Sequence, residues 1–194
     1  MTKSRVLGGV SVAALALVLG LGAEAQDVRE PHAQDRQQAR EDGNVSIKVP
    51  PLMAEEHEEL HAKLAALVGA GGETGAAAHK VEEALAPHFE EENRYALPPL
   101  GLLSELARGR ATEDMRPAIE LSRHVAQNLD RYIDEHREIA AALNGLEAAG
   151  KAEGNSDAVE FAAELRRHAR QEEELFYPTA ILIGRYLERE LGGP

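Results

Sequence analysis

Two histidine–glutamate pairs at the same spacing are the residues of this 194-residue chain best suited to chemistry. His88 is followed four residues later by Glu92, and His168 is followed four residues later by Glu172. Residues four apart share one face of a helix, so each pair would present an imidazole nitrogen beside a carboxylate. Imidazole and carboxylate together bind divalent transition metals, so the pairs indicate metal binding.

Each pair is preceded by one more histidine at nearly the same distance. His57 lies 31 residues before His88, and His136 lies 32 residues before His168. The two halves of the chain therefore contain an internal repeat of two segments each. Such a repeat predicts that equivalent side chains are related by a pseudo-two-fold axis.

Four segments with helical periodicity must position these residues. Apolar residues recur in them at intervals of three and four, and Ala, Leu and Glu dominate the composition. We expect helices over residues 51–68, 74–96, 113–149 and 156–191, with a short connecting helix within 100–110 and Ser156 as the cap of the last helix. The short first and last connections predict an all-α, up-down-up-down four-helix bundle.

The histidines and glutamates of the repeat interrupt the apolar faces of these helices and so point into the bundle. Burying ionised carboxylates without partners is costly, and two divalent metal ions would remove that cost. The sequence therefore predicts a site for two metal ions, with six ligands: His57, His88, Glu92, His136, His168 and Glu172.

This doubled pattern resembles the hemerythrin-like (HHE, cation-binding) domain family. The resemblance covers about residues 51–191 and is carried by the stretches PHFEEE (87–92) and EEELFYP (172–178). It implies a non-haem di-iron centre with the four histidines as nitrogen ligands and with Glu92 and Glu172 as bridging carboxylates. The implied function is binding of dioxygen, of a related small molecule (peroxide or nitric oxide) or of iron itself.

The resemblance leaves several points open. It favours a binding or carrier protein and assigns no catalytic residue, while peroxide or ferroxidase-type activity remains an alternative. Zinc or manganese would accept the same ligands as iron. Oxygen-carrying members of the family use five histidines, so His61, one turn after His57, is a candidate fifth nitrogen ligand, although its counterpart in the other half is Ala140.

Aromatic residues near the predicted ligands have two interpretations. Tyr95 and Tyr132 lie one turn from Glu92 and His136, respectively. They are expected to be core tyrosines, with hydrogen bonding to the metal centre as the alternative. The remaining histidines have no partner in the repeat and are expected in surface or capping roles: His32, His79 and His124.

Two other classes of function remain as alternatives. His57-Glu58-x-x-His61 fits the H-E-x-x-H motif of zinc peptidases, but that hypothesis leaves the rest of the repeat unexplained. A metal-free helical bundle that binds another protein is the second alternative, and the expected burial of glutamates argues against it.

Composition and the first residues restrict the remaining possibilities. The net charge of −13 argues against nucleic acid as a partner, and the absence of cysteine excludes disulfides and thiolate sites. Residues 1–25 are typical of a secretory signal peptide, with a membrane anchor as the alternative. We expect a polar tether over 26–49 and one metal-binding domain over 50–194. The expected product is exported to a periplasm and is free of the membrane once the signal is removed.

Overall fold

The computed structural model describes residues 47–192, so the expected signal segment 1–25 and residues 26–46 of the expected tether lie outside the described part. Within residues 47–192 every regular element is helical and no strand is present. None of the described helices is long and apolar enough to span a membrane. Ile47 and Val49 pack partly buried against the core, so the packed domain already includes them.

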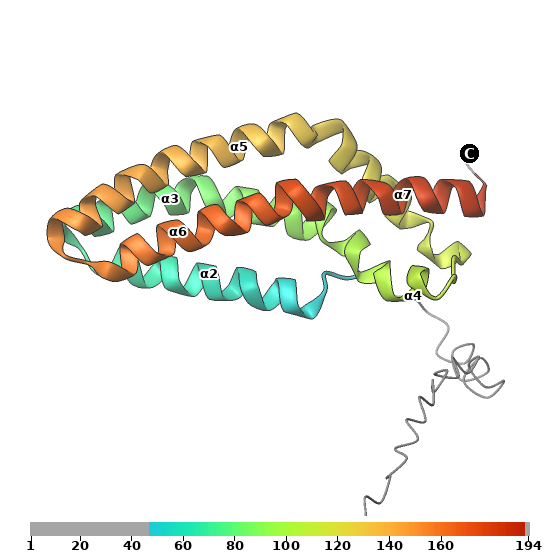
Figure 1. Ribbon diagram of the computed structural model, residues 1–194, viewed down its shortest axis with the longest axis horizontal. Coiled ribbons are helices and arrows are strands. Elements are labelled where there is room, and N and C mark those ends of the chain that lie inside the picture. The colour runs from blue at the N-terminus through green and yellow to red at the C-terminus, as the bar shows by residue number, and fades with distance from the viewer. Residues whose placement is uncertain (1–46, 193–194) are drawn as a thin grey trace, which may run out of the picture. The chain divides into compact units, whose positions relative to one another are not determined.

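Four long helical segments lie lengthwise beside one another, as Figure 1 shows, which confirms the expected all-α class. They are α2 (Pro51–Gly69); α3 (Gly72–Glu91) continued by the π-helical turn η1 (Glu92–Ala96); α5 (Pro117–Glu153); and α6 (Ser156–Gln171) continued by the π-helical turn η4 (Glu172–Phe176) and α7 (Tyr177–Leu191). The connector between the second and third segments contains η2 (Pro98–Leu102), α4 (Leu103–Ala107) and η3 (Glu113–Met115).

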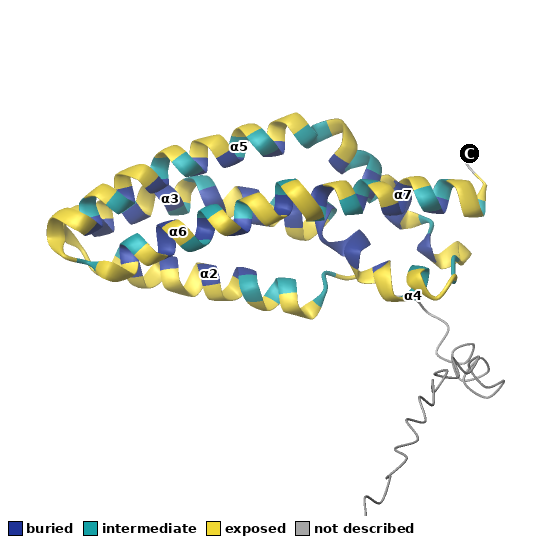
Figure 2. Cartoon of the chain, viewed as in Figure 1, coloured by how far each residue is buried: buried dark blue, intermediate teal, exposed yellow. Residues whose placement is uncertain are grey.

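The helices pack through the apolar faces that the sequence pattern predicts. Helix α3 packs on α2 and α5, while α5 also packs on α6 and α7, and α2 on α6. Figure 2 shows the buried residues on the inward faces of these helices. The largest apolar cluster includes Leu60, Leu64, Val81, Leu85, Ile139, Leu143, Phe161 and Leu165. On each of the four helices this cluster stops within one turn of a histidine of the repeat, so apolar packing fixes the position of all four.

The two π-helical turns begin at the two glutamates of the repeat, Glu92 and Glu172. A π-turn accommodates an extra residue within a helix and is common at functional sites. The sequence pattern predicted uninterrupted helices over these residues. The interruptions fall at equivalent places in the two halves, directly where the predicted ligands lie.

The cap of the last helix differs from the expectation. Asn155, rather than Ser156, is the N-cap residue, and its side chain accepts a hydrogen bond from the backbone N–H of Ala158 at 3.2 Å. Asn155 is favoured because Gly154 before it adopts the left-handed conformation (φ 71°) that ends α5. Ser156 is consequently the first residue inside α6.

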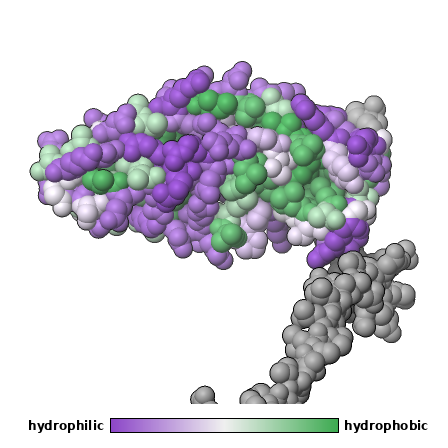
Figure 3. Space-filling model, viewed as in Figure 1, coloured by the Kyte–Doolittle hydropathy of each residue, from purple (hydrophilic) through white to green (hydrophobic). Residues whose placement is uncertain are grey.

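Apolar surface is concentrated on one part of the face in Figure 3. There, apolar side chains gather along η4 and α7 and towards α4, while hydrophilic side chains cover most of the part nearer the α5–α6 turn. Leu175 and Leu182 are among the exposed large apolar residues of the described chain.

Close packing of α7 on α5 requires a glycine, which gives a testable prediction. A Cβ atom added at Gly184 would lie 2.3 Å from the Cβ of Ser122. We expect Gly184→Ala to lower the free energy of unfolding by about 1–3 kcal/mol, because the two helices must move apart. Gly145→Ala in α5 is the matched control, since an added Cβ there meets nothing within 4 Å, and it should raise stability by about 0.5–1 kcal/mol. Denaturant unfolding of both variants measures these changes. Equal changes in the free energy of unfolding would contradict the close contact between α7 and α5 at Gly184.

Candidate metal centre

The four histidines and two glutamates of the repeat converge in the interior of the bundle, where all six are buried. They form two groups of four residues, and within each group the possible ligand atoms all lie within 4.8 Å of one another. One group contains His57 and His168, the other contains His88 and His136, and both include Glu92 and Glu172. In the sequence repeat His57 corresponds to His136 and His88 to His168, so each group contains one histidine from each of these corresponding pairs.

The carboxylate of Glu172 faces both groups. Its Oε1 lies 2.8 Å from Nε2 of His168 and 3.6 Å from Nε2 of His57, whereas its Oε2 lies 3.3 Å from Nε2 of His136. One oxygen thus points to each group, which is the orientation that a bridging carboxylate requires.

The carboxylate of Glu92 is shared differently, because Tyr177 holds one of its oxygens. The Tyr177 hydroxyl donates a hydrogen bond to Oε1 and lies 3.2 Å from Nε2 of His136. The other oxygen, Oε2, lies 3.5 Å from Nε2 of His88 and 3.8 Å from Nε2 of His57. Sequence reasoning did not identify Tyr177, although it lies in the EEELFYP stretch that carries the family resemblance.

Buried polar atoms without hydrogen-bond partners show that these residues fit a metal. Among residues 47–192, the orphaned atoms include both ring nitrogens of His57, Nε2 of His168, Oε2 of Glu92 and both oxygens of Glu172. Nε2 of His168 is 2.8 Å from Oε1 of Glu172, yet the two are not aligned for a hydrogen bond. Each buried unsatisfied group costs about 1–3 kcal/mol. Divalent cations bound by both groups would remove these costs, so the donor set suits two ions.

Three further glutamates pair with the outer nitrogens of three of the four clustered histidines. Nδ1 of His88 pairs with Glu135 at 2.8 Å, and Nδ1 of His136 pairs with Glu173 at the same distance. Nδ1 of His168 pairs with Glu56 at 3.1 Å. A carboxylate on Nδ1 fixes the proton there and leaves Nε2 free to bind a metal. The repeat offered a signal for two of them, because Glu56 and Glu135 directly precede His57 and His136.

The two central carboxylates have opposite pKa shifts in the metal-free protein. Burial, followed by the negative charge of Glu172, raises the pKa of Glu92 well above its ordinary value. Burial acts in the same direction on Glu172, but the nearby imidazoles of His136 and His168 outweigh it and hold its pKa well below the ordinary value. Without metal, the centre therefore favours one neutral and one ionised carboxylate.

The histidines also differ in pKa. Burial lowers the pKa of His88, and its pairing with Glu135 does not compensate. Burial acts to lower the pKa values of His136 and His168 too, but their carboxylate neighbours, above all Glu172, outweigh it and raise both above 6.5. His136 and His168 therefore keep their positive charge to a higher pH than an ordinary histidine, whereas His88 loses its charge at a lower pH.

These shifts predict opposite pH responses for the metal-free and metal-loaded protein. A raised histidine pKa stabilises the fold fully below pH 6.5, and that contribution is lost as pH rises through the folded-state pKa values of His136 and His168. We therefore expect the metal-free protein to lose stability from pH 6.5 to 8. Affinity for Zn²⁺ should rise over the same range, by up to about tenfold per pH unit for each proton displaced. Unfolding experiments on the metal-free protein and Zn²⁺ titrations across this pH range measure the two trends. If stability and Zn²⁺ affinity changed in the same direction with pH, the assignment of His136 and His168 as metal ligands would be contradicted.

The structure places His61 outside both groups. It is exposed, and its ring meets the edge of Phe89 with ring centroids 5.1 Å apart. Phe89 stacks on the ring of His57 at 3.9 Å, so the same phenyl group contacts both histidines. The zinc-peptidase hypothesis needs His57 and His61 to share one site, but His57 lies in a buried group that does not contain His61.

The other predicted aromatic and histidine residues lie around the centre. Tyr132 is buried with its hydroxyl unpaired within the described part of the chain, and its ring stacks on that of Tyr177 at 5.1 Å. Tyr95 stacks instead on His124 at 3.8 Å, and Nε2 of His124 pairs with Glu91 at 2.7 Å. Neither the two predicted tyrosines, Tyr95 and Tyr132, nor His124 belongs to either ligand group. His79, on the exposed side of α3, pairs with Glu82 and Glu83, and His32 lies outside the described residues.

A very small cavity adjoins the centre. Its volume is about 10 Å³, and it is lined by ligand side chains and by apolar groups of Leu85, Phe89, Ile139, Leu165 and Ala169. A space of this size holds about one water-sized molecule. The cavity beside His88, His136, His168 and Glu172 therefore has room only for a small molecule.

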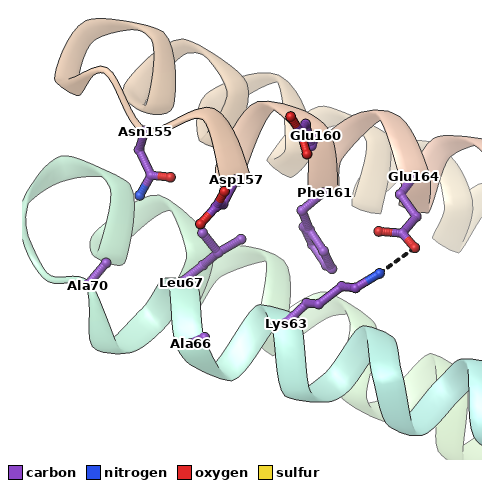
Figure 4. A pocket seen from close by; sticks show the side chains of 9 residues that line it. All are labelled: Lys63, Ala66, Leu67, Ala70, Asn155, Asp157, Glu160, Phe161 and Glu164. Atoms are coloured by element: carbon purple, nitrogen blue, oxygen red, sulfur yellow. Dashed lines mark hydrogen bonds and ion pairs between the residues drawn. The ribbon is translucent and has the colours of Figure 1, made fainter.

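A separate hollow of about 320 Å³ lies between α2 and α6. Figure 4 shows its lining, with the ammonium of Lys63 on α2 paired to the carboxylate of Glu164 on α6 at 2.6 Å. Leu67 and Phe161 form its apolar wall. None of the six clustered residues lines this hollow, so it is distinct from the candidate centre.

Comparison with known proteins agrees with this geometry. The family model described as the hemerythrin HHE cation-binding domain matches residues 51–180, more than half of the chain. The curated proteins and the solved structures give no significant match. The matched region contains all six clustered residues and the three glutamates that hold their outer nitrogens. The chain belongs to the hemerythrin HHE cation-binding domain family.

Proposed function

We propose that this protein holds two iron ions in the buried histidine–glutamate centre and binds dioxygen or a related small molecule there. The observation that carries the proposal is the pair of overlapping ligand groups that share Glu92 and Glu172. Iron in such a site would supply a change of oxidation state and open coordination positions, which binding of dioxygen, peroxide or nitric oxide requires. Zinc and manganese would fit the same donors.

The protein's own residues would bind, orient and shield the ions. His57 and His168 would hold one ion and His88 and His136 the other, with the two glutamates between them. Carboxylates on the outer nitrogens keep the ring protons away from the metal side. The adjoining cavity of about 10 Å³ would limit the ligand to a small molecule.

A second candidate function is reaction with peroxide. Five nitrogen ligands suit reversible binding, whereas four leave more coordination positions open. His61 lies outside both ligand groups, which supports the four-nitrogen set. Turnover of peroxide and storage of iron itself therefore stand beside small-molecule binding as functions of the same centre.

We also infer that the bundle runs up-down-up-down and that its halves are a structural repeat. The support is the two-residue spacing between α2 and α3 and between α5 and α6, together with π-helical turns that begin at Glu92 in one half and Glu172 in the other.

The export of the protein through the segment 1–25 is likewise a proposal. It rests on the basic start, the apolar run and the Ala23-Glu24-Ala25 pattern.

A cavity-filling variant tests whether the small-molecule site is the one beside the centre. Ala169 lines the cavity, so Ala169→Leu should fill it and weaken binding of nitric oxide by at least about tenfold, or 1.4 kcal/mol, with iron content unchanged. Ala163→Leu on the exposed side of α6 is the matched control. Absorption spectra of the iron-loaded variants with nitric oxide give the affinities. Full binding by the Ala169 variant would place the ligand elsewhere.

A further inference from the structure

His57 is the exception among the four clustered histidines. The other three each place Nδ1 within 3.1 Å of a glutamate oxygen. Nδ1 of His57 is buried and has no hydrogen-bond partner among residues 47–192. Its ring is held instead by stacking on Phe89, which fixes the plane of the imidazole but not the position of its proton.

The repeat explains the missing partner. Glu173, directly after Glu172, reaches Nδ1 of His136. The residue directly after Glu92, at the equivalent place in the other π-helical turn, is Asn93. Asn93 has a side chain one methylene shorter and without charge, and it is exposed. The half of the centre that contains His57 thus lacks the carboxylate that its counterpart has.

The contacts of the other two outer glutamates also favour the group of His88 and His136 over the group of His57 and His168. Glu135 lies 2.8 Å from Nδ1 of His88 and is itself held by Arg131 at 2.6 Å. Its counterpart Glu56 lies farther from its histidine, at 3.1 Å from Nδ1 of His168. The ring nitrogens His88 Nε2 and His136 Nε2 already lie 2.9 Å apart. The group of His88 and His136 is therefore the better organised of the two.

We propose that the two metal positions differ in affinity, so that the ions bind in sequence. The first ion enters between His88 and His136, and the second enters the weaker position between His57 and His168. A carboxylate on the outer nitrogen raises the basicity of a ligating imidazole and fixes its orientation, and its loss typically weakens metal binding about 10–100-fold. This inference rests on the proposed function, because it assigns an order of loading to that same centre.

Sequential loading has a consequence for the protein. At limiting metal the chain carries one ion in the tighter position, and the weaker position exchanges its ion with the surroundings. The two-ion centre then forms only above a threshold concentration of free metal, and the dissociation constant of the weaker position sets that threshold. Asn93 is the residue that tunes this threshold.

Titration of the metal-free full chain with Co²⁺, followed by absorption and by metal content, tests the proposal. We expect two binding phases separated by about 10–100-fold. Asn93→Glu should supply the missing carboxylate and bring the weaker phase towards the tighter one. Glu173→Asn, the mirror-image change, should weaken the tighter phase. Gln171→Glu adds the same charge beside Glu172 as a control and should move neither phase by more than a few-fold.

Removal of single ligands identifies which phase belongs to which position. His57→Ala should abolish only the weaker phase, and His136→Ala should abolish the tighter one. Two ions bound with one common affinity, or separate phases that neither Asn93→Glu nor Glu173→Asn moves, would overturn the inference and leave the metal centre intact. Failure of the unmodified protein to bind Co²⁺ would overturn the proposed function itself.

Discussion

The Glu172→Gln variant is expected to lose both metal ions, because this one carboxylate belongs to both ligand groups. Its Oε1 faces His57 and His168, and its Oε2 faces His136. Glutamine keeps the shape of the side chain but removes the negative charge that balances two cations in a buried site. We expect affinity to fall by more than the roughly 10–100-fold effect of losing an outer hydrogen-bond partner. Metal content after dialysis at limiting free iron measures the loss.

Two other variants serve as controls for that result. His88→Ala removes a ligand from one group only, so one ion should remain. His124→Ala removes a histidine that pairs with Glu91 and stacks on Tyr95, outside both groups, so it should keep two ions. Retention of two ions by the Glu172 variant would show that this residue is not a metal ligand. Loss of both ions from His124→Ala would show that metal content reports unfolding instead.

Removal of the metal is expected to destabilise the fold strongly. The metal-free centre contains several buried atoms without hydrogen-bond partners, and burial raises the pKa of Glu92. Free metal at about 1,000 times its dissociation constant stabilises the folded state by about 4 kcal/mol. For a domain of this size that corresponds to a rise in Tm of roughly 8–16 °C. Circular-dichroism melts with Zn²⁺ and with a chelator measure the difference.

The Glu172→Gln variant provides the control for this experiment as well. If the stabilisation comes from the centre, Zn²⁺ should raise the Tm of the unmodified protein but not that of the variant. An equal rise in both would indicate that the metal binds elsewhere on this acidic surface. Equal melting temperatures with and without metal in the unmodified protein would contradict a buried binding site.

The helices and the burial and clustering of the six residues could be predicted from the sequence, because both depend on spacing along a single helix. His88 and Glu92 share a helix face whatever their neighbours are, and the repeat supplied the second set independently. The apolar periodicity of the same helices then determined that these faces point inward. The confirmed all-helical fold and the buried clustering follow from these local rules.

The features that the sequence did not predict depend on contacts between helices or on the conformation of the backbone. Glu173 and Tyr177 reach residues on other helices, and no spacing rule relates them to His136 or Glu92. The π-helical turns were not predicted because the three-and-four-residue periodicity assumes an uninterrupted α-helix. The cap at Asn155 instead of Ser156 depended on the conformation of Gly154, which neighbouring polar residues do not reveal.

Metal content is the most direct test of a two-ion centre. The metal-free full chain would be loaded with ferrous iron without oxygen, freed of excess iron, exposed to air and analysed for iron per chain together with its absorption spectrum. Two irons per chain, with near-ultraviolet charge-transfer absorption that appears in air, is the predicted result. Absence of bound iron, or a single tightly bound zinc that iron does not replace, would contradict the di-iron assignment.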